Sequence, residues 1–330
     1  MKSEKSKKLF SNKGKKIKIV SMKNYFIVNK ASRTGKAALV WDKIEEYLKA
    51  NGVSYEVHFT EKAKDATEFA KSATGTGEDV ALFVMGGDGT LNEALNGIVD
   101  FDHTYYTPLP SGSANDFVSG IGMTGDAVEI LHKALNNPEV KTFDVGRASY
   151  NNESRLFGVS SGIGVDAYVC LQALDSKLKR FLNKFGMGSA TYGLLTVGDI
   201  FTMPFSDGVI TYYYKGERKK LEVKNIIFTA AMNCKAEGGG IPMAPEATAD
   251  CGYMTAFVAH DISRLKCLGL LPSLVAGKHM GKKGFDLLKF DKFEIFMEDE
   301  MCVHADGEHV GFLRNITFEC LPGILKIRGF

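Results

Sequence analysis

The sequence predicts an α/β N-terminal domain with a parallel sheet, followed by a second domain that is mainly an antiparallel β-sandwich. Up to about residue 140, short apolar runs alternate with amphipathic helical stretches, which is the βαβ order of a parallel sheet. Beyond it, short stretches of alternating polarity are separated by turn residues. We therefore expect a basic, disordered extension at 1–21, an α/β domain at 22–140 and a β-rich domain at 141–330, whose C-terminal segment is free to return to the first domain.

The elements of the first half follow from its hydrophobic pattern. Apolar runs predict strands at 25–28, 53–59, 80–85 and 105–109. Helical spacing of apolar residues predicts helices from Lys36 to Asn51, at 62–72, from Thr90 onward and at 126–135. Thr90 and Glu93 have the spacing of a capping box, which predicts that the third helix begins at that point.

Three loops of small polar residues follow strands of this half, at 29–35, 86–89 and 110–117. Ligands of parallel sheets bind beyond the carboxyl ends of the strands, so we expect the loops to share one crevice. In the second loop, glycines let a ligand approach the backbone, and the following helix offers free N–H groups to an anion. Asp88 would repel a phosphate unless a divalent cation lay between them, or unless Asp88 oriented a water molecule or a hydroxyl. This loop therefore predicts a Mg²⁺-nucleotide phosphate site, with a tight strand-to-helix turn as the alternative interpretation.

The second half is dominated by short stretches with strand patterning. We predict strands at 142–148, 156–160, 208–214, 226–232, 253–259, 293–297, 302–304, 317–320 and 324–327. Two helical patterns interrupt them, at 166–201, with a break near Gly186, and at 262–277.

Composition places the chain among soluble globular proteins. Of its 330 residues, 45% are hydrophobic and 24% are charged. The six cysteines show no paired short spacings, so we expect reduced thiols and a cytoplasmic protein. No run reaches the roughly 20 apolar residues that a membrane span requires, and no signal peptide is recognisable. Residues 1–20 hold eight lysines and one glutamate, a tail that suits an anionic membrane surface or nucleic acid.

Three segments, in order, resemble the diacylglycerol kinase catalytic family in its bacterial lipid kinase branch. They are GGDGTLNEALNG at 86–97, PSGSANDF at 110–117 and Asp306-Gly307-Glu308, within a similarity that runs from residue 25 to residue 330. The resemblance implies the fold of NAD kinases and diacylglycerol kinases, with ATP and Mg²⁺ as cofactors. It also implies transfer of the γ-phosphoryl group of ATP to a hydroxyl of a diacylglycerol-like or sphingoid lipid.

The same resemblance implies a role for each matched residue. Asp306 would be the catalytic group that accepts the proton of the attacking hydroxyl, although Asp-Gly between apolar runs is also a hairpin signal. Asp88 and Asp116 would hold Mg²⁺, and Asp250 would hold a structural Mg²⁺. The residues that would bind the nucleotide are Asn29, Ser32, Gly86, Gly87, Gly89, Thr90, Ser111, Gly112, Asn115 and Glu308.

The sequence departs from the family pattern at three places. In the first loop Lys30 and Arg33 replace a proline and a glycine, which alters the fit to a nucleotide. Ser119 stands where an arginine commonly follows the Asn-Asp-Phe segment, which removes an anion contact. Cys251 replaces the second aspartate of an Asp-Asp-Gly element, so Asp250 is left alone as a metal ligand.

The expected partner is a lipid substrate at the membrane surface, reached by transient peripheral association. An apolar stripe flanked by lysines fits an interfacial helix as well as a helix that faces the core, and it consists of Leu174, Leu178, Phe181, Leu182 and Phe185. The run at 268–275, followed by Lys278, His279, Lys282 and Lys283, has the same two interpretations. We expect no specific nucleic acid as a partner. A homodimer is one possible oligomeric state. An NAD kinase and a catalytically weak nucleotide-binding regulator are the alternative functions.

Overall fold

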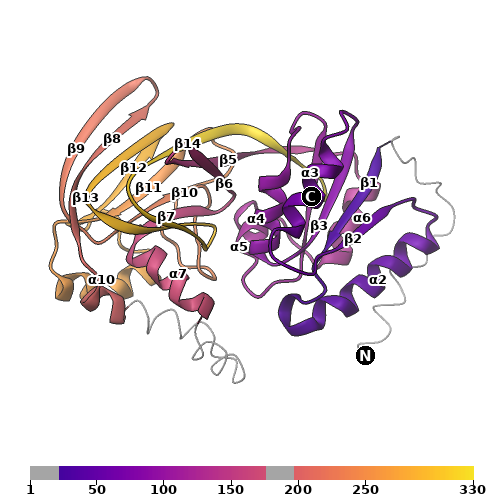
Figure 1. The fold of residues 1–330 in the computed structure, drawn as a ribbon, viewed down its shortest axis with the longest axis horizontal. Helices are drawn as coiled ribbons and strands as arrows, with labels where there is room; N and C mark the ends of the chain where they lie inside the picture. Colours follow the sequence, from indigo (N-terminus) through magenta and orange to yellow (C-terminus); the bar gives the residue numbers. More distant parts are fainter. Residues whose placement is uncertain (1–21, 176–196) are drawn as a thin grey trace.

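The computed structural model describes residues 22–175 and 197–330, and its strands form one continuous hydrogen-bonded sheet (Figure 1). An α/β region occupies one end of the molecule and a β-sandwich the other. The α/β region contains β1 (Lys23–Val28), β2 (Glu56–Phe59), β3 (Val80–Gly86), β4 (Thr104–Pro110), η1 (Ser32–Gly35), α2 (Lys36–Ala50), α3 (Asp65–Thr74), α4 (Asp88–Gly97), α5 (Asp116–Gly120) and α6 (Ala127–Asn136).

The four strands of the α/β region are parallel, in the spatial order β4-β3-β1-β2. All seven residues of β3 are buried, as expected for a central parallel strand with helices on both faces. The rings of Phe26 and Phe83 stack on neighbouring strands with centroids 4.6 Å apart. The sheet therefore presents the carboxyl ends of β1, β3 and β4 at one edge, where the three predicted loops lie.

The second region is an antiparallel sandwich, which confirms the predicted fold class. Its elements are β5 (Lys141–Tyr150), β6 (Glu153–Phe157), β7 (Ser160–Gly164), α7 (Val165–Asp175), β8 (Ser206–Tyr214), β9 (Glu217–Ile226), β10 (Phe228–Met232), β11 (Met254–Ala259), α10 (Arg264–Val275), β12 (Phe285–Phe290), β13 (Lys292–Ala305) and β14 (Glu308–Ile327). β13 pairs with β8 at its start and with β7 at its end, so it passes from one layer to the other. A core that includes Phe290, Phe293 and Phe318 fills the sandwich.

The long strand β14 connects the two regions. It pairs antiparallel with β13 and β5, and its last residues pair parallel with β4, at Lys326↔Tyr105 and Ile327↔Tyr106. Figure 1 shows this strand running from the sandwich into the α/β region. Main-chain hydrogen bonds thus fix the two regions to each other, and the turn between β13 and β14 comes to lie near α4.

Three details differ from the sequence predictions. The predicted capping box is wrong, because α4 begins at Asp88 after Gly87, which has no side chain to act as a cap. Thr90 instead accepts a hydrogen bond from the Asn29 amide through Oγ1 (3.0 Å). The strands β9 and β12 were not predicted, and the pairs of short strands predicted at the C-terminal end are the single strands β13 and β14. The stripe from Leu178 to Phe185 lies outside the described residues.

Candidate active site

The predicted glycine loops meet beyond the carboxyl ends of the strands. Gly112 approaches Gly87 so closely that a Cβ atom on Gly112 would lie 2.6 Å from the Cα of Gly87. The backbone N–H of Ser111 donates to the carbonyl oxygen of Gly86 (2.9 Å), and the Ser32 hydroxyl donates to the carbonyl oxygen of Ser111 (3.0 Å). The structure thus gathers the predicted binding residues of all three loops in one place.

Asp88 begins α4 and holds the third loop in position. Its Oδ2 accepts from the backbone N–H of Asn115 (3.0 Å), and its Oδ1 accepts from that of Phe117 (3.3 Å). Asn115 in turn accepts from the N–H of Gly112 through Oδ1 (3.0 Å). Burial, followed by the charges of Asp116 and Asp306, raises the pKa of Asp88 to about 6.

Asp116 begins α5 and contacts the second region. Its Oδ2 accepts a hydrogen bond from the backbone N–H of Gly239 (2.9 Å) in a glycine-rich loop. Burial and the charge of Asp306 raise the pKa of Asp116. A cluster of carboxylates that raise one another's pKa values is the electrostatic setting in which a bound cation is favourable. Among the described residues, Asp88, Asp116 and Asp306 do not bring three ligand atoms within 4.8 Å of one another, so the assignment of Asp88 and Asp116 as metal ligands stays a prediction.

Asp306 lies in the two-residue turn between β13 and β14. Both turn residues have positive φ, 48° at Asp306 and 81° at Gly307, as a type I′ hairpin turn requires. The Oδ1 atom accepts from the backbone N–H groups of Val159 (2.8 Å) and Ser160 (3.0 Å). The Oδ2 atom accepts from the Gly158 N–H and from the Asn92 amide, both at 2.7 Å. The turn geometry confirms the hairpin interpretation of the Asp-Gly pair.

These four donors occupy the lone-pair directions of the Asp306 carboxylate. Asn92 belongs to α4, and the other three donors lie in the connection between β6 and β7 and at the first residue of β7, so Asp306 joins the two regions. Glu308 differs, because its carboxylate has no hydrogen-bond or ion-pair partner among the described residues. Its Oε1 lies beside Gly89, where a Cβ atom would approach it to 3.2 Å. The assignment of Asp306 as proton acceptor stays a prediction, and the contacts favour Glu308 as the freer group.

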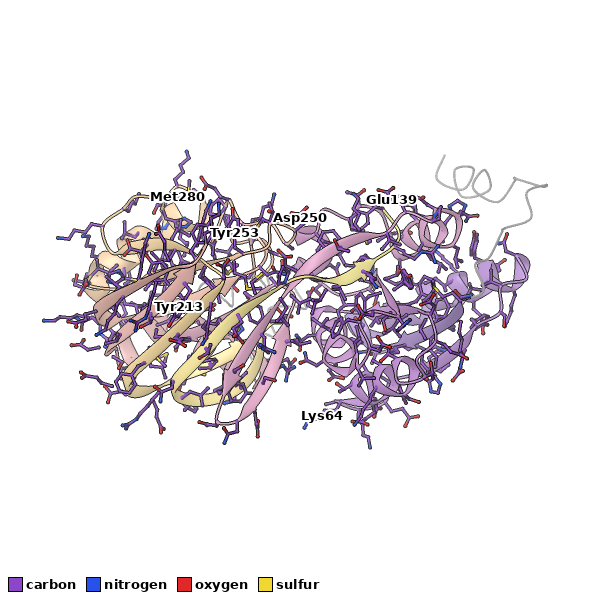
Figure 2. The ribbon with its side chains drawn as sticks, turned by 90° about the horizontal axis from the view of Figure 1, so that it is seen from above. Lys64, Glu139, Tyr213, Asp250, Tyr253 and Met280 are labelled. Carbon is purple, nitrogen blue, oxygen red and sulfur yellow. The ribbon has the colours of Figure 1, made fainter. Side chains whose placement is uncertain are left out.

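One small cavity lies at the candidate site, and a larger one lies elsewhere in the second region. The one between Asp88 and Asp306 is also lined by Tyr106, Phe117 and Val159, and it has about 10 Å³ of room for the centre of a water-sized sphere. That is space for about one water molecule. A larger cavity of about 350 Å³ lies in the second region, and its lining includes Met280 but none of the predicted site residues (Figure 2).

Asp250 lies apart from the paired glycine loops. It is exposed in the loop before β11, and its charge raises the pKa of Asp144, after the larger effect of burial (Figure 2). The Cys251 thiol lies 3.1 Å from the carbonyl oxygens of Thr248 and Tyr253. Within residues 22–175 and 197–330, no three potential metal ligands that include Asp250 lie within 4.8 Å of one another. The structural metal site at Asp250 therefore stays a prediction.

A buried polar cluster that the sequence analysis did not single out lies behind Asp306. The backbone N–H of Gly307 donates to Nδ1 of His304 (3.1 Å), so Nε2 carries the ring proton and donates to Oδ2 of Asp166 (2.7 Å). Gly162 makes room for this pair, since a Cβ atom there would lie 2.0 Å from the Asp166 carboxylate and 2.4 Å from His304. His304, Asp166 and Cys170 could surround a metal ion, but the bond from Gly307 favours the tautomer that cannot ligate through Nε2.

The sequence analysis also did not single out Glu237. It is buried, and neither carboxyl oxygen has a hydrogen-bond partner among the described residues. Burial, followed by the charge of Asp166, raises the pKa of Glu237 to about 8. The hydroxyl of Ser160 lies near enough to favour the charged form but is not aligned for a hydrogen bond. The only signal in the sequence was an acidic residue placed directly before three glycines.

Replacing Glu237 by glutamine is expected to stabilise the folded protein by an amount that grows with pH. Between the ordinary pKa of 4.5 and the folded-state pKa of about 8, the unfolded chain is ionised while the folded carboxyl keeps its proton. Rising pH therefore lowers the free energy of unfolding of the native protein across this window, and glutamine lacks that contribution. Urea denaturation near both ends of the window measures the effect, with the exposed Glu46→Gln as control. A stability difference independent of pH would contradict it.

Comparisons with known proteins identify the family of both regions. Residues 23–148 match the diacylglycerol kinase catalytic domain, and residues 159–329 match the YegS C-terminal NAD kinase beta sandwich-like domain. A relative from Bacillus subtilis named putative lipid kinase YtlR is 28% identical over 294 residues, which are 87% of this chain and 93% of the relative. A probable lipid kinase YegS-like protein of Chromohalobacter salexigens is 26% identical over 82% of both chains.

The fold has solved counterparts. The crystal structure of a putative diacylglycerol kinase from Bacillus anthracis superposes with a TM-score of 0.70 at 21% sequence identity, covering 93% of this chain and 97% of that one. None of the helices in the described part of the chain is long and apolar enough to cross a bilayer. Because both family domains are present in order, and the second alone spans more than half of the chain, the protein belongs to the YegS type of the diacylglycerol kinase-like family of lipid kinases.

Proposed function

We propose that the protein is an ATP-dependent lipid kinase that transfers the γ-phosphoryl group to a hydroxyl of a diacylglycerol-like or sphingoid lipid. The observation that carries the proposal is the meeting of Asp88, from the α/β region, with Asp306, from the sandwich, around one small cavity. Phosphoryl transfer requires positioned phosphates, charge neutralisation and a group near the attacking hydroxyl. The chain supplies a candidate residue for each of these requirements.

The two touching glycine loops and the start of α4 form the proposed phosphate site. Backbone N–H groups at the start of a helix and in glycine loops bind phosphate oxygens well, because no side chain blocks the approach. Asn29 and Ser32 tie the first loop to the other two through hydrogen bonds to Thr90 and Ser111. Asp88 and Asp116 would hold a Mg²⁺ ion, which when bound supplies positive charge beside the phosphates.

The proton of the attacking hydroxyl goes, in our proposal, to a carboxylate of the Asp-Gly-Glu turn. Asp306 has its lone pairs engaged by four donors, so its contribution is to fix the turn against α4. Glu308, the first residue of β14, has a carboxylate without a partner among the described residues. It lies beside Gly89 in the first turn of α4 and is therefore the better acceptor. The polar cluster of His304 and Asp166 supports the turn from behind through the N–H of Gly307.

Replacing Gly112 by alanine is expected to lower kcat/KM for ATP about 10²-fold, since a misplacement of about 1 Å near the reacting groups has effects of that size. The new methyl group would lie 2.6 Å from the Cα of Gly87, so the two phosphate loops must separate. Initial rates at varied ATP concentration measure the loss. Gly269→Ala, which meets nothing within 4 Å, serves as the control. An unchanged kcat/KM for ATP would show that the contact between the loops is unimportant.

The proposed function is tested by incubating the purified protein with γ-labelled ATP and Mg²⁺, in separate reactions with extracted membrane lipids and with NAD. We expect label in a lipid whose free hydroxyl has become a phosphate ester, and no labelled dinucleotide. Label in NADP alone would establish the NAD kinase alternative. Binding of ATP without any labelled product would leave a nucleotide-binding regulator as the function.

A further inference from the structure

The helix α10 and the loop that follows it leave an apolar face uncovered. Only Cys267 and Leu274 of α10 are buried, although most of its residues are apolar. Leu265 is 72% exposed, Val275 is 63% exposed and Met280, in the following loop, is 46% exposed. Figure 2 places Met280 at the surface of the sandwich region. We call these three residues, with the exposed lysines Lys266, Lys278, Lys282 and Lys283, the α10 patch.

The segment that carries the α10 patch has charge of one sign, although Glu246 and Asp286 line the cavity beside Met280. No acidic residue occurs between Ile262 and Phe285. The acidic residues that flank this stretch, Asp261 and Asp286, both hydrogen-bond to the ring of His260 at 2.9 Å. The four patch lysines therefore face solvent without a carboxylate of their own segment to pair with.

The helix that carries the patch is held firmly on the sandwich. Cys267 and Leu274 pack in a core shared with Val169 of α7 and Phe257 of β11. The Arg264 guanidinium donates to the carbonyl oxygen of Met203 (2.7 Å) and stacks over the Phe205 ring at 4.0 Å. Figure 1 shows α7 and α10 on the same side of the sandwich sheet. The exposed apolar residues of α10 therefore belong to a helix that packs firmly against the sandwich core.

We propose that the α10 patch docks on the surface of an anionic lipid bilayer. Exposed apolar side chains with lysines in the same segment suit the boundary of a membrane. There the apolar side chains enter the acyl region and the lysines contact lipid phosphates. A second copy of this chain fits less well, since pairing two identical patches would bring their lysines together. This inference deepens the proposed function by assigning the surface that brings the kinase to its substrate, and vesicle binding can be measured without ATP.

A tryptophan placed in the patch tests the docking directly. The chain has one tryptophan, Trp41, which is 1% exposed, so a second indole on the surface reports on its own surroundings. Leu265→Trp is compared with Leu39→Trp, at an exposed leucine (66%) on α2 of the other region. Vesicles contain phosphatidylcholine alone or with an equal part of phosphatidylglycerol, and a further set carries bromine on the acyl chains.

We expect a blue shift and bromine quenching for Leu265→Trp with the anionic vesicles, and neither for Leu39→Trp. The double variant Lys282→Gln/Lys283→Gln should raise the lipid concentration for half-maximal binding about 30-fold, as the loss of two surface lysines at about 1 kcal/mol each predicts. The matched pair Lys43→Gln/Lys71→Gln should leave it unchanged. An unshifted Leu265→Trp would overturn the proposal even if the chain binds vesicles through its basic tail. A blue shift that needs protein concentration and no lipid would assign the face to self-association instead.

The kinase function and the docking surface can be disproved independently of each other. Vesicle docking without phosphorylation of any lipid would remove the kinase function and keep the surface. Phosphorylation of a short-chain, water-soluble acceptor by both Leu265→Trp and the native protein, without docking by either, would keep the kinase and remove the surface.

Discussion

Replacing Asp88 by asparagine is expected to lower kcat/KM by about 10³-fold while the protein stays folded, which is the scale of losing one charged group that acts in the transition state. Asp88 has two proposed tasks, and the substitution affects them differently. The amide oxygen of asparagine can still accept one of the hydrogen bonds from Asn115 and Phe117. It cannot supply the negative charge that holds a divalent ion beside the phosphates.

The same substitution should stabilise the metal-free protein at neutral pH. The pKa of Asp88 in the folded protein is about 6, above the ordinary value of 3.8, so the free energy of unfolding falls as the pH rises from about 4 to about 6, and the loss is complete at neutral pH. An uncharged asparagine removes this effect. Steady-state kinetics and thermal unfolding without Mg²⁺ give the two measurements, with the exposed Asp42→Asn as control. Normal turnover in the Asp88→Asn protein would eliminate Asp88 from the chemistry.

The second large effect separates Asp306 from Glu308. Asp306→Asn is expected to cost about 2–4 kcal/mol of stability, because the amide NH₂ group then faces two donors in a partly buried site. Glu308→Gln is expected to leave stability unchanged, since no partner is lost, and to lower kcat by about 10²–10⁴-fold through loss of the proton acceptor. ATP should bind to both variants.

Urea denaturation and kcat, measured on both variants, decide between the roles. Glu298→Gln, at an exposed position of β13, is the control for a neutralised glutamate. If Glu308→Gln keeps its kcat while Asp306→Asn loses activity without losing stability, then Asp306 is the proton acceptor and the positioning role assigned to it is incorrect.

The order of elements in the first half could be predicted because its signals are local. Apolar runs and glycine loops mark β1, β3 and β4 without reference to distant residues. The start of α4 was misplaced by two residues, because the Thr90 hydroxyl is engaged by Asn29, 61 residues earlier in the chain. The spacing of Thr90 and Glu93 cannot reveal that Asn29 binds the Thr90 hydroxyl.

The lengths of the two C-terminal strands could not be predicted from local signals. Acidic residues near 298–300 and the Pro322-Gly323 pair look like strand ends, and the ladder pairing is interrupted at both places. β13 and β14 nevertheless continue past them, because paired residues follow on the far side of each interruption. The contacts of Asp306 were equally hidden. Its backbone donors lie about 150 residues away in the chain, so its motif indicated the site but not the four bonds that restrict its role.

The pairing of β14 with β4 also constrains how the protein is made. During synthesis the α/β region emerges first, but the edge of β4 has no neighbour on that side until Lys326 and Ile327 have left the ribosome, more than 200 residues later. An uncovered strand edge invites pairing with other chains. The β4 edge of a nascent chain therefore stays open to pairing with other chains for most of translation. A premature stop that removes only this strand end would leave that edge uncovered in the finished chain.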